Sequence, residues 1–333
     1  MPKPVARPEQ VLIAHSRPSI GKVLLETIGN TPLLRLDRLA DSFPGIELLG
    51  KAEWVNPGGS VKDRAAAAIV KAAIDSGELT AGRILLDSTS GNTGIAYAML
   101  GAALGFPVTL CVPSNVSPER KRILAAYGAK IIYTEADAGS DGAIRKAREV
   151  VAAEPEKYLY VDQYSNSANW RAHYCGTGNE IWQQSQGRVT HFVSMLGTSG
   201  TFVGTARRLK ELNPKIQCIS LQPDSPFHGI EGAKHMPSAM VPQIYDPTLA
   251  DQNIEVGTEE SYEMCKRLAR DEGLLVGISA GAAAAGCVRV AKRLASVGEN
   301  AVIVTVLCDN ADKYLSERFW EEHHPETGDN WVI

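Results

Sequence analysis

The sequence predicts an α/β protein of two lobes, each with a parallel-rich sheet covered by helices on both faces (α/β/α). Three observations lead to this prediction. The chain has 333 residues, which is long enough for two hydrophobic cores. Strand-like runs alternate with helical segments, and the runs are too apolar to have one face in water. No repeat, low-complexity tract or long linker interrupts the pattern, so we expect the lobes to pack around a cleft.

The first series of elements lies between residues 20 and 161. It opens with a helical pattern from residue 20, a turn before a short strand near 33–36, and a strand at 46–53. A glycine-rich loop then leads into an alanine-rich helix that contains residues 65–73. Further strands and helices are expected to alternate at 83–87, 92–104, 108–112, 118–127, 130–134, 140–153 and 158–161.

The second series begins with a helix around residue 181 and continues with a strand at 191–196, a helix at 201–212 and a strand at 216–222. Helices at 258–272 and 282–294 precede a last core strand at 301–307. We therefore predict a smaller lobe at about 55–165, and a larger lobe made of about 21–54 and 166–320. Residues 1–20 are predicted to be a flexible arm, and residues 321–333 a C-terminal tail.

The composition excludes several classes of partner. Lys and Arg number 34 against 38 Asp and Glu, and no basic tract of five or more residues occurs, so neither nucleic acid nor a membrane surface is predicted as a partner. No apolar stretch reaches transmembrane length, and a cytoplasmic location is the expectation. The six cysteines are scattered without a Cys-x-x-Cys pair, which indicates free thiols rather than a zinc site or disulfides.

The loop at residues 56–64 reads Asn-Pro-Gly-Gly-Ser-Val-Lys-Asp-Arg. Pro57 and the two glycines prevent a helix before Ser60, and Ser60 is a suitable N-cap, so Lys62 is predicted in the first helical turn. A lysine held inside a cleft can have its pKa lowered by burial and act as a nucleophilic amine. On spacing alone, an ordinary solvated lysine is the commoner interpretation.

Two more loops each join an apolar strand to a helix. The loop at 88–94, Ser-Thr-Ser-Gly-Asn-Thr-Gly, has hydroxyls and backbone N–H groups that suit a carboxylate, although a simple capped turn is an equal alternative. The loop at 197–201, Gly-Thr-Ser-Gly-Thr, suits a phosphate monoester better than a mere tight turn. Its glycine spacing fits a dinucleotide site poorly.

These motifs, in this order, resemble those of the cysteine synthase and cystathionine β-synthase family, the β-replacing enzymes of pyridoxal phosphate (PLP) fold type II, which is tryptophan synthase β-like. The resemblance covers about residues 22–320. It implies that PLP is the cofactor and that Lys62 is the catalytic lysine that carries the PLP Schiff base. No metal is implied.

The resemblance also assigns the other loops. It implies that Thr89, Ser90 and Thr93 grip the carboxylate of the amino-acid substrate with help from Gln163, and that Asn92 contacts the cofactor ring hydroxyl. Ser279 matches a further family residue near the cofactor. The PLP phosphate is expected on the loop formed by Gly197, Thr198, Ser199, Gly200 and Thr201.

Cys308 occupies the position that lies beside the pyridine nitrogen in this family, where the A-type cysteine synthases have serine and the B-type isozyme has cysteine. A neutral partner cannot hold the ring nitrogen protonated as an aspartate would, which favours elimination of a β-leaving group over transamination. The Cys308-Asp309 pair and the segments at 172–174 and 188–194 lean toward the B-type O-acetylserine sulfhydrylases. Asn179 and Ala280 depart from the usual family residues.

The resemblance implies a cysteine synthase that replaces the acetate of O-acetyl-L-serine with sulfide or another sulfur donor. The alternatives are an O-phosphoserine sulfhydrylase, in which Lys234 would meet the substrate phosphate, a cystathionine β-synthase, or a non-catalytic PLP-binding partner of serine acetyltransferase. A homodimer is expected, with serine acetyltransferase as a candidate partner. The ending at Ile333 resembles that of serine acetyltransferases, so the tail is a candidate to cap the cleft.

Overall fold

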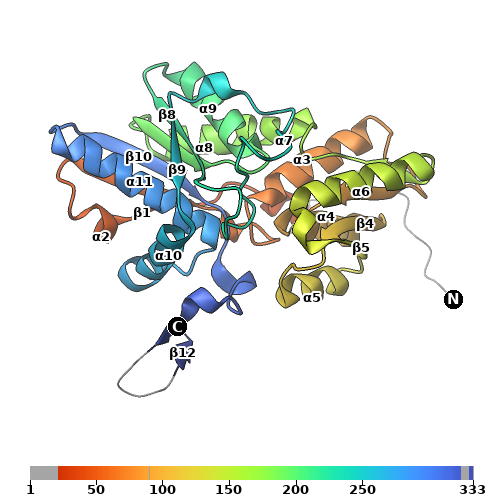
Figure 1. Cartoon of the computed structure of the whole chain (residues 1–333). Helices are drawn as coiled ribbons and strands as arrows, with labels where there is room; N and C mark the ends of the chain where they lie inside the picture. The colour runs from red at the N-terminus through yellow and green to blue at the C-terminus, as the bar shows by residue number, and fades with distance from the viewer. Residues whose placement is uncertain (1–21, 90, 324–329, 333) are drawn as a thin grey trace.

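The computed structural model describes residues 22–89, 91–323 and 330–332. The predicted arm, Ser90 and most of the predicted tail fall outside these ranges. Two α/β units lie side by side, the larger on the left and the smaller on the right of Figure 1. The predicted fold class, two α/β units with parallel-rich sheets, is confirmed. Within the described ranges, no helix is both long enough and apolar enough to span a bilayer.

The larger unit is built on a six-stranded sheet in the order β1-β2-β10-β7-β8-β9. Every neighbouring pair is parallel except β1 with β2. The strands are β1 (Leu33–Arg35), β2 (Ile46–Ala52), β7 (His191–Met195), β8 (Gln217–Pro223), β9 (Gln252–Val256) and β10 (Ala301–Leu307).

Both faces of this sheet are buried, and β10 shows why. Ile303 belongs to one hydrophobic core, whereas Val302 and Val304 belong to the other, since successive side chains of a strand point to opposite faces. The helices of the first core are α2 (Asp37–Ala40), α10 (Thr258–Glu272) and α11 (Ile278–Ser296). The second core contains α8 (Gly178–Gln184) and α9 (Gly200–Leu212), and α7 (Ser167–Ala172) packs on α9.

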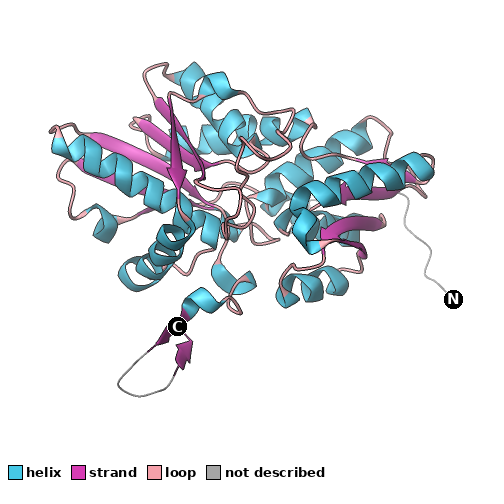
Figure 2. Cartoon of the chain, in the orientation of Figure 1, coloured by secondary structure: helices cyan, strands magenta, loops and turns pink. Residues whose placement is uncertain are grey.

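The smaller unit has a four-stranded parallel sheet in the order β5-β4-β3-β6. Helices flank this sheet in Figure 2. Leu85 and Leu110 belong to the core that contains α3 and α4, whereas Leu86 and Cys111 belong to the core that contains α6. The elements are α3 (Lys62–Asp75), β3 (Ile84–Ser88), α4 (Asn92–Leu104), β4 (Val108–Pro113), α5 (Pro118–Ala126), β5 (Lys130–Thr134), α6 (Gly139–Ala153) and β6 (Tyr158–Tyr160).

Three local features differ from the prediction. The helical pattern expected from residue 20 is only a 3-10 turn, η1 (Leu24–Thr27). Strand β9 was not predicted, because it lies at the sheet edge and its polar residues alternate with half-buried ones. Helix α3 begins at Lys62 with Val61 as its N-cap, so the predicted N-cap Ser60 is wrong by one residue, although its Oγ accepts the Lys62 N–H at 3.2 Å.

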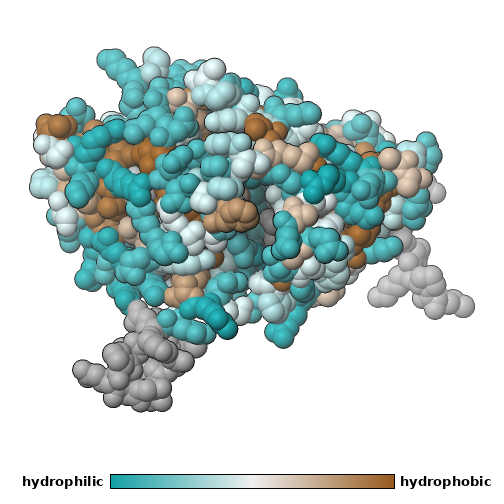
Figure 3. Space-filling view, in the orientation of Figure 1, coloured by the Kyte–Doolittle hydropathy of each residue, from teal (hydrophilic) through white to brown (hydrophobic). Residues whose placement is uncertain are grey.

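The predicted loops meet where the two units face each other. The loop after β3, the loop after β7 and Cys308 after β10 all follow the carboxyl ends of parallel strands, where α/β proteins bind ligands. On the face shown in Figure 3, the surface is mostly hydrophilic and is hollowed between the two units. The fold therefore places described residues of both loops, together with Cys308, around one cleft.

Candidate active site

One pocket brings together nearly all the residues predicted to act on cofactor or substrate. It is lined by Lys62, Thr89, Asn92, Thr93, Gln163, Gly197, Thr198, Ser199, Thr201, Lys234, Ser279 and Cys308. Gly200 does not line the pocket, but it is the buried first residue of α9 in the same loop. Ser90, the remaining predicted residue, is outside the described part of the chain.

The lysine loop is docked on the end of β10. The Val61 N–H donates to the Cys308 carbonyl at 2.8 Å, and Ser60 pairs with Asp309 in an isolated antiparallel β-bridge of the backbone. Gly59 has φ +76°, a left-handed conformation that glycine adopts without strain. Inside the loop, the Gly58 N–H donates to the buried Asp63 carboxyl, whose pKa is raised by burial to about 7. These contacts fix the backbone of Lys62 at the pocket wall.

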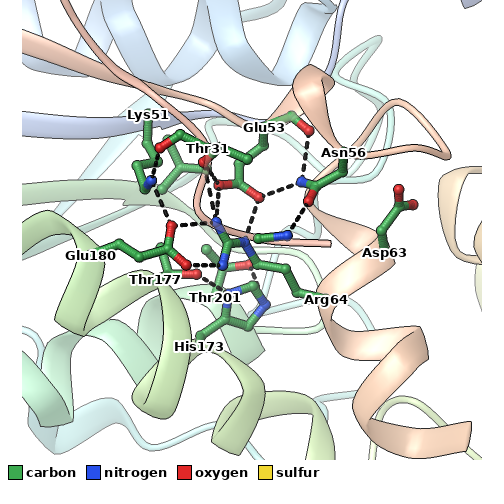
Figure 4. Close-up of polar contacts among 12 residues, drawn as sticks. Thr31, Lys51, Glu53, Asn56, Asp63, Arg64, His173, Thr177, Glu180 and Thr201 are labelled. Atoms are coloured by element: carbon green, nitrogen blue, oxygen red, sulfur yellow. Dashed lines mark hydrogen bonds and ion pairs between the residues drawn. The ribbon is translucent and has the colours of Figure 1, made fainter. Parts of the chain in front are cut away.

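A buried ion network lies behind the lysine loop (Figure 4). Arg64 contacts Glu53 and Glu180 at 2.7 Å and 2.6 Å, and Lys51 contacts Glu180 at 2.6 Å. Lys51 and Glu53 are fully buried, so each charge depends on its partners. The network joins the first turn of α3 to the end of β2 and to α8. Its members are distant in sequence, so no local motif predicts the network.

Acidification should destabilise the protein through this network. Burial raises the pKa of Glu180, but the hydrogen bonds and charges of Arg64 and Lys51 outweigh that effect and hold it at about 2, below the ordinary 4.5. A depressed carboxyl pKa stabilises the fold above pH 4.5, and this stability is lost as the pH falls toward 2. The linked loss is about 3 kcal/mol in the free energy of unfolding.

Urea unfolding measured at several values between pH 5 and pH 2 tests this expectation. The Glu180→Gln variant has no carboxyl to titrate, so its stability should fall less steeply over the same range. The same slope in both proteins would mean that Glu180 is not the group responsible.

The loop at 88–94 presents donors at the N-terminus of α4. Thr89 Oγ1 accepts hydrogen bonds from the Gly91 and Gly94 N–H groups at 3.0 Å and 3.1 Å, which leaves its own proton for a ligand. Gln163 ties this loop to the end of β6, since its Nε2 donates to the Ser88 carbonyl and its Oε1 accepts from Thr93 Oγ1. Helix dipole and hydroxyl groups together suit a carboxylate.

The loop at 197–201 forms an anion nest at the N-terminus of α9. Ser199 has φ +68°, an uncommon conformation for a residue with a side chain and one that is found in anion-binding backbone nests. Its buried hydroxyl has no hydrogen-bond partner among the described residues. A Cβ at Gly197 would collide with the Gly232 carbonyl, so the loop tolerates only glycine there. Buried hydroxyls and a helix N-terminus fit a phosphate group.

Cys308 and Asn92 line the pocket from different units, Cys308 from the larger and Asn92 from the smaller. Burial raises the pKa of the Cys308 thiol to about 11, although nearby Lys62 opposes the shift, so the thiol is neutral at pH 7. Asn92 donates through Nδ2 to Asp309 Oδ2 at 2.8 Å, and Tyr314 donates to the same oxygen at 2.8 Å. The buried Asp309 therefore fixes the orientation of Asn92. In the sequence, Asp309 is recognisable only as part of a family motif.

Two ion pairs join the units at the mouth of the pocket. Lys234 is buried and contacts Asp141 of α6 at 2.7 Å, and Arg120 of α5 contacts Glu231. Lys234 lines the pocket as predicted, but its charge is already balanced by Asp141, which lies 93 residues away in the sequence. Asp141 lies on α6 and Arg120 on α5. Both helices contain many charged residues, and no sequence motif indicates which of them pair across the pocket.

Two α/β units, a lysine at a helix start and a glycine-rich anion nest in the shared cleft define the class of PLP enzymes with fold type II. The family model described as "Pyridoxal-phosphate dependent enzyme" matches residues 24–309. The chain belongs to this family.

Known relatives extend the comparison. The chain is 49% identical to a cysteine synthase of Aquifex aeolicus over 316 residues, which cover 94% of this chain and 97% of the relative. It is 40% identical to cysteine synthase B of Escherichia coli over 92% of this chain and 98% of that protein. The crystal structure of cysteine synthase from Entamoeba histolytica superposes with a TM-score of 0.85 at 35% identity, covering 92% of this chain and 93% of the other.

Proposed function

We propose that this chain is a PLP-dependent cysteine synthase, which replaces the acetate of O-acetyl-L-serine with sulfide or another sulfur donor and releases L-cysteine. One observation carries the proposal: a single pocket brings together Lys62, a carboxylate-binding helix N-terminus, a phosphate nest and a neutral thiol, from loops far apart in the sequence. The cysteine synthases among its relatives support the same activity.

The residues present fit PLP. The nest at 197–201 would hold the phosphate, with the Ser199 hydroxyl available to it, and Asn92 and Cys308 would flank the ring. Bound PLP supplies an electron sink for the negative charge that develops at the substrate Cα. Cys308 would be a neutral partner for the ring nitrogen, which would weaken this sink and favour rapid loss of a β-substituent.

The chain's own groups then bind the substrate and move the proton. The Thr89 hydroxyl and the N–H groups at the start of α4, including that of Thr93, bind the substrate carboxylate, while the Thr93 hydroxyl and Gln163 hold the loop in place. Ser90 and Ser279 are assigned to substrate and cofactor on the family resemblance. Lys62 Nζ removes the proton from Cα while acetate leaves Cβ, and it returns the proton after sulfide adds at Cβ.

A two-step absorbance experiment tests the proposed function. O-acetyl-L-serine added alone to the PLP-loaded protein should change the visible spectrum, and sulfide added afterwards should reverse the change with release of cysteine. L-serine with homocysteine, the substrates of a cystathionine β-synthase, should give no comparable turnover. A spectrum that is unchanged by O-acetyl-L-serine would contradict the proposal and favour a non-catalytic PLP-binding protein.

The ion pair of Lys234 favours the acetyl ester over the phosphate ester. The Lys234 ammonium retains further N–H donors, but the neighbouring Asp141 carboxylate balances its charge and would repel a substrate phosphate. We expect kcat/KM for O-phosphoserine to be at least about tenfold below that for O-acetylserine. Asp141→Asn removes this negative charge but keeps a hydrogen-bond acceptor, and it should raise the phosphate-to-acetyl ratio about tenfold.

Steady-state kinetics with both esters measures this ratio. Glu149→Gln, which changes an exposed carboxylate on the same helix α6, is the matched control and should leave the ratio unaltered. A wild-type preference for O-phosphoserine would overturn the assignment of the leaving group.

We also propose a homodimer, a cytoplasmic location and serine acetyltransferase as the candidate protein partner. The family resemblance supports the dimer and the partner, and six unpaired cysteines support a reducing compartment.

The grouping of β3–β6 in one sheet supports a smaller lobe at about 55–165, with the larger lobe formed by about 21–54 and 166–320. The capping role suggested for Ile333 concerns a residue outside the described part of the chain.

A further inference from the structure

His173 is a buried residue directly behind the anion nest. It begins the π-helical turn η4 (His173–Thr177), which follows α7 and packs against α9. Its Nε2 lies 3.3 Å from Thr201 Oγ1 of the nest, and its Nδ1 lies 2.9 Å from Thr177 Oγ1 (Figure 4). Burial, together with the positive charges of Arg64 and Lys62, holds the pKa of His173 well below its usual 6.5. The ring is therefore neutral and has one donor and one acceptor nitrogen.

Asn169 lies four residues earlier and makes a parallel contact. Its Nδ2 donates to the Gln163 carbonyl at 2.7 Å and to Thr198 Oγ1 at 3.1 Å. Since a carbonyl oxygen can only accept, the contact with Gln163 fixes the amide orientation. Thr198 Oγ1 therefore receives a proton from behind, and its own hydroxyl proton remains available to a ligand in front.

The same requirement decides the tautomer of His173. If Thr201 donated its single proton to Nε2, its oxygen would offer only lone pairs to the nest and would repel a phosphate dianion. If Nε2 carries the proton and donates to Thr201 Oγ1, the Thr201 proton can point into the nest. In that tautomer, Nδ1 accepts from the Thr177 hydroxyl. Only the second arrangement stabilises a bound anion.

We propose that His173 and Asn169 are positioning residues for the cofactor phosphate: each donates a hydrogen bond to a nest hydroxyl, His173 as its Nε2–H tautomer, and so directs the protons of Thr201 and Thr198 toward the anion. This inference rests on the proposed function, because it takes the ligand of the nest to be the PLP phosphate. The residues of the sequence motif form the nest itself. His173 and Asn169, on η4 and α7, form a second layer behind it.

Cofactor affinity provides the test. We expect His173→Phe and Thr201→Val each to weaken PLP binding to the apoprotein about tenfold, because each loses one hydrogen bond directed at a charged group. The double variant should be about as weak as either single variant, since His173 acts through Thr201. His173→Gln retains an N–H donor and should recover part of the affinity. Pyridoxal, which has no phosphate, should bind all these variants with similar affinity.

Asn179→Ala is the matched control, since this residue lies on the next turn, contacts Cys175 and Arg208, and does not line the pocket. Its PLP affinity should equal that of the wild type. In the wild-type protein loaded with PLP, the ¹⁵N NMR spectrum of the imidazole should show a protonated Nε2 and an unprotonated Nδ1. This measurement requires no variant to fold.

The outcomes separate the two proposals. If the wild type binds PLP but carries the His173 proton on Nδ1, or if the losses of His173→Phe and Thr201→Val are additive, the inference is overturned and the proposed function stands. If the wild type does not bind PLP, the proposed function itself fails.

Discussion

Replacing Lys62 by alanine should reduce cysteine synthesis roughly 10⁴-fold, because the same Nζ removes and returns the substrate proton. The visible absorbance that depends on a bond between cofactor and lysine should also be absent. Lys62 lies at the first position of α3 and its side chain reaches the pocket, so its removal leaves the core packing unchanged.

Initial rates of cysteine formation, together with the absorbance spectrum, measure this effect. Lys71→Ala is the matched control: it removes another lysine of α3, which is 69% exposed and pairs with Asp75 away from the pocket. The control should retain wild-type activity. Substantial turnover in Lys62→Ala would show that another group moves the proton.

Replacing Arg64 by methionine should lower the free energy of unfolding by about 3–5 kcal/mol. The substitution leaves the buried Glu53 without its guanidinium partner and removes one of the two cations that contact Glu180. Such carboxylates must either remain charged in a poorly solvating interior or take up protons. The loss should grow as the pH rises above their ordinary pKa values, because ionisation then costs most.

Urea unfolding at neutral pH tests this second expectation. Arg35→Ala is the control, since Arg35 pairs with Asp37 on the surface, where both side chains are more than half exposed, and an exposed pair contributes about 0–1 kcal/mol. Equal stabilities of the two variants would mean that the buried network contributes little, and that Arg64 does not anchor the loop of Lys62.

Much of the fold could be predicted from local sequence. Apolar runs such as 108–112 and 301–307 have the composition of strands buried on both faces, and they were found as β4 and β10. Edge strand β9 was missed, because alternating polar residues in a short segment carry little strand signal. The turn at Leu24–Thr27 was taken for a longer helix, since apolar periodicity alone does not set the length of a helix.

The site shows the same division between local and distant information. Lys62 and the nest at 197–201 each lie in a compact motif, so their place in a shared pocket could be predicted from local sequence. The partners of these motifs could not. Asn92 contacts Asp309 across 217 residues, Lys234 contacts Asp141 across 93, and His173 contacts Thr201 across 28. The first two pairs depend on the packing of the two units and the third on the packing of η4 against α9, which no local pattern encodes.

The central claim is that Lys62 holds the cofactor in a pocket shared by both units. The most direct measurement is borohydride reduction of the PLP-loaded protein, followed by proteolysis and mass spectrometry of the labelled peptide. The account predicts one phosphopyridoxyl group, on Lys62. A label on another lysine, such as Lys51 or Lys234, or no label at all, would contradict it.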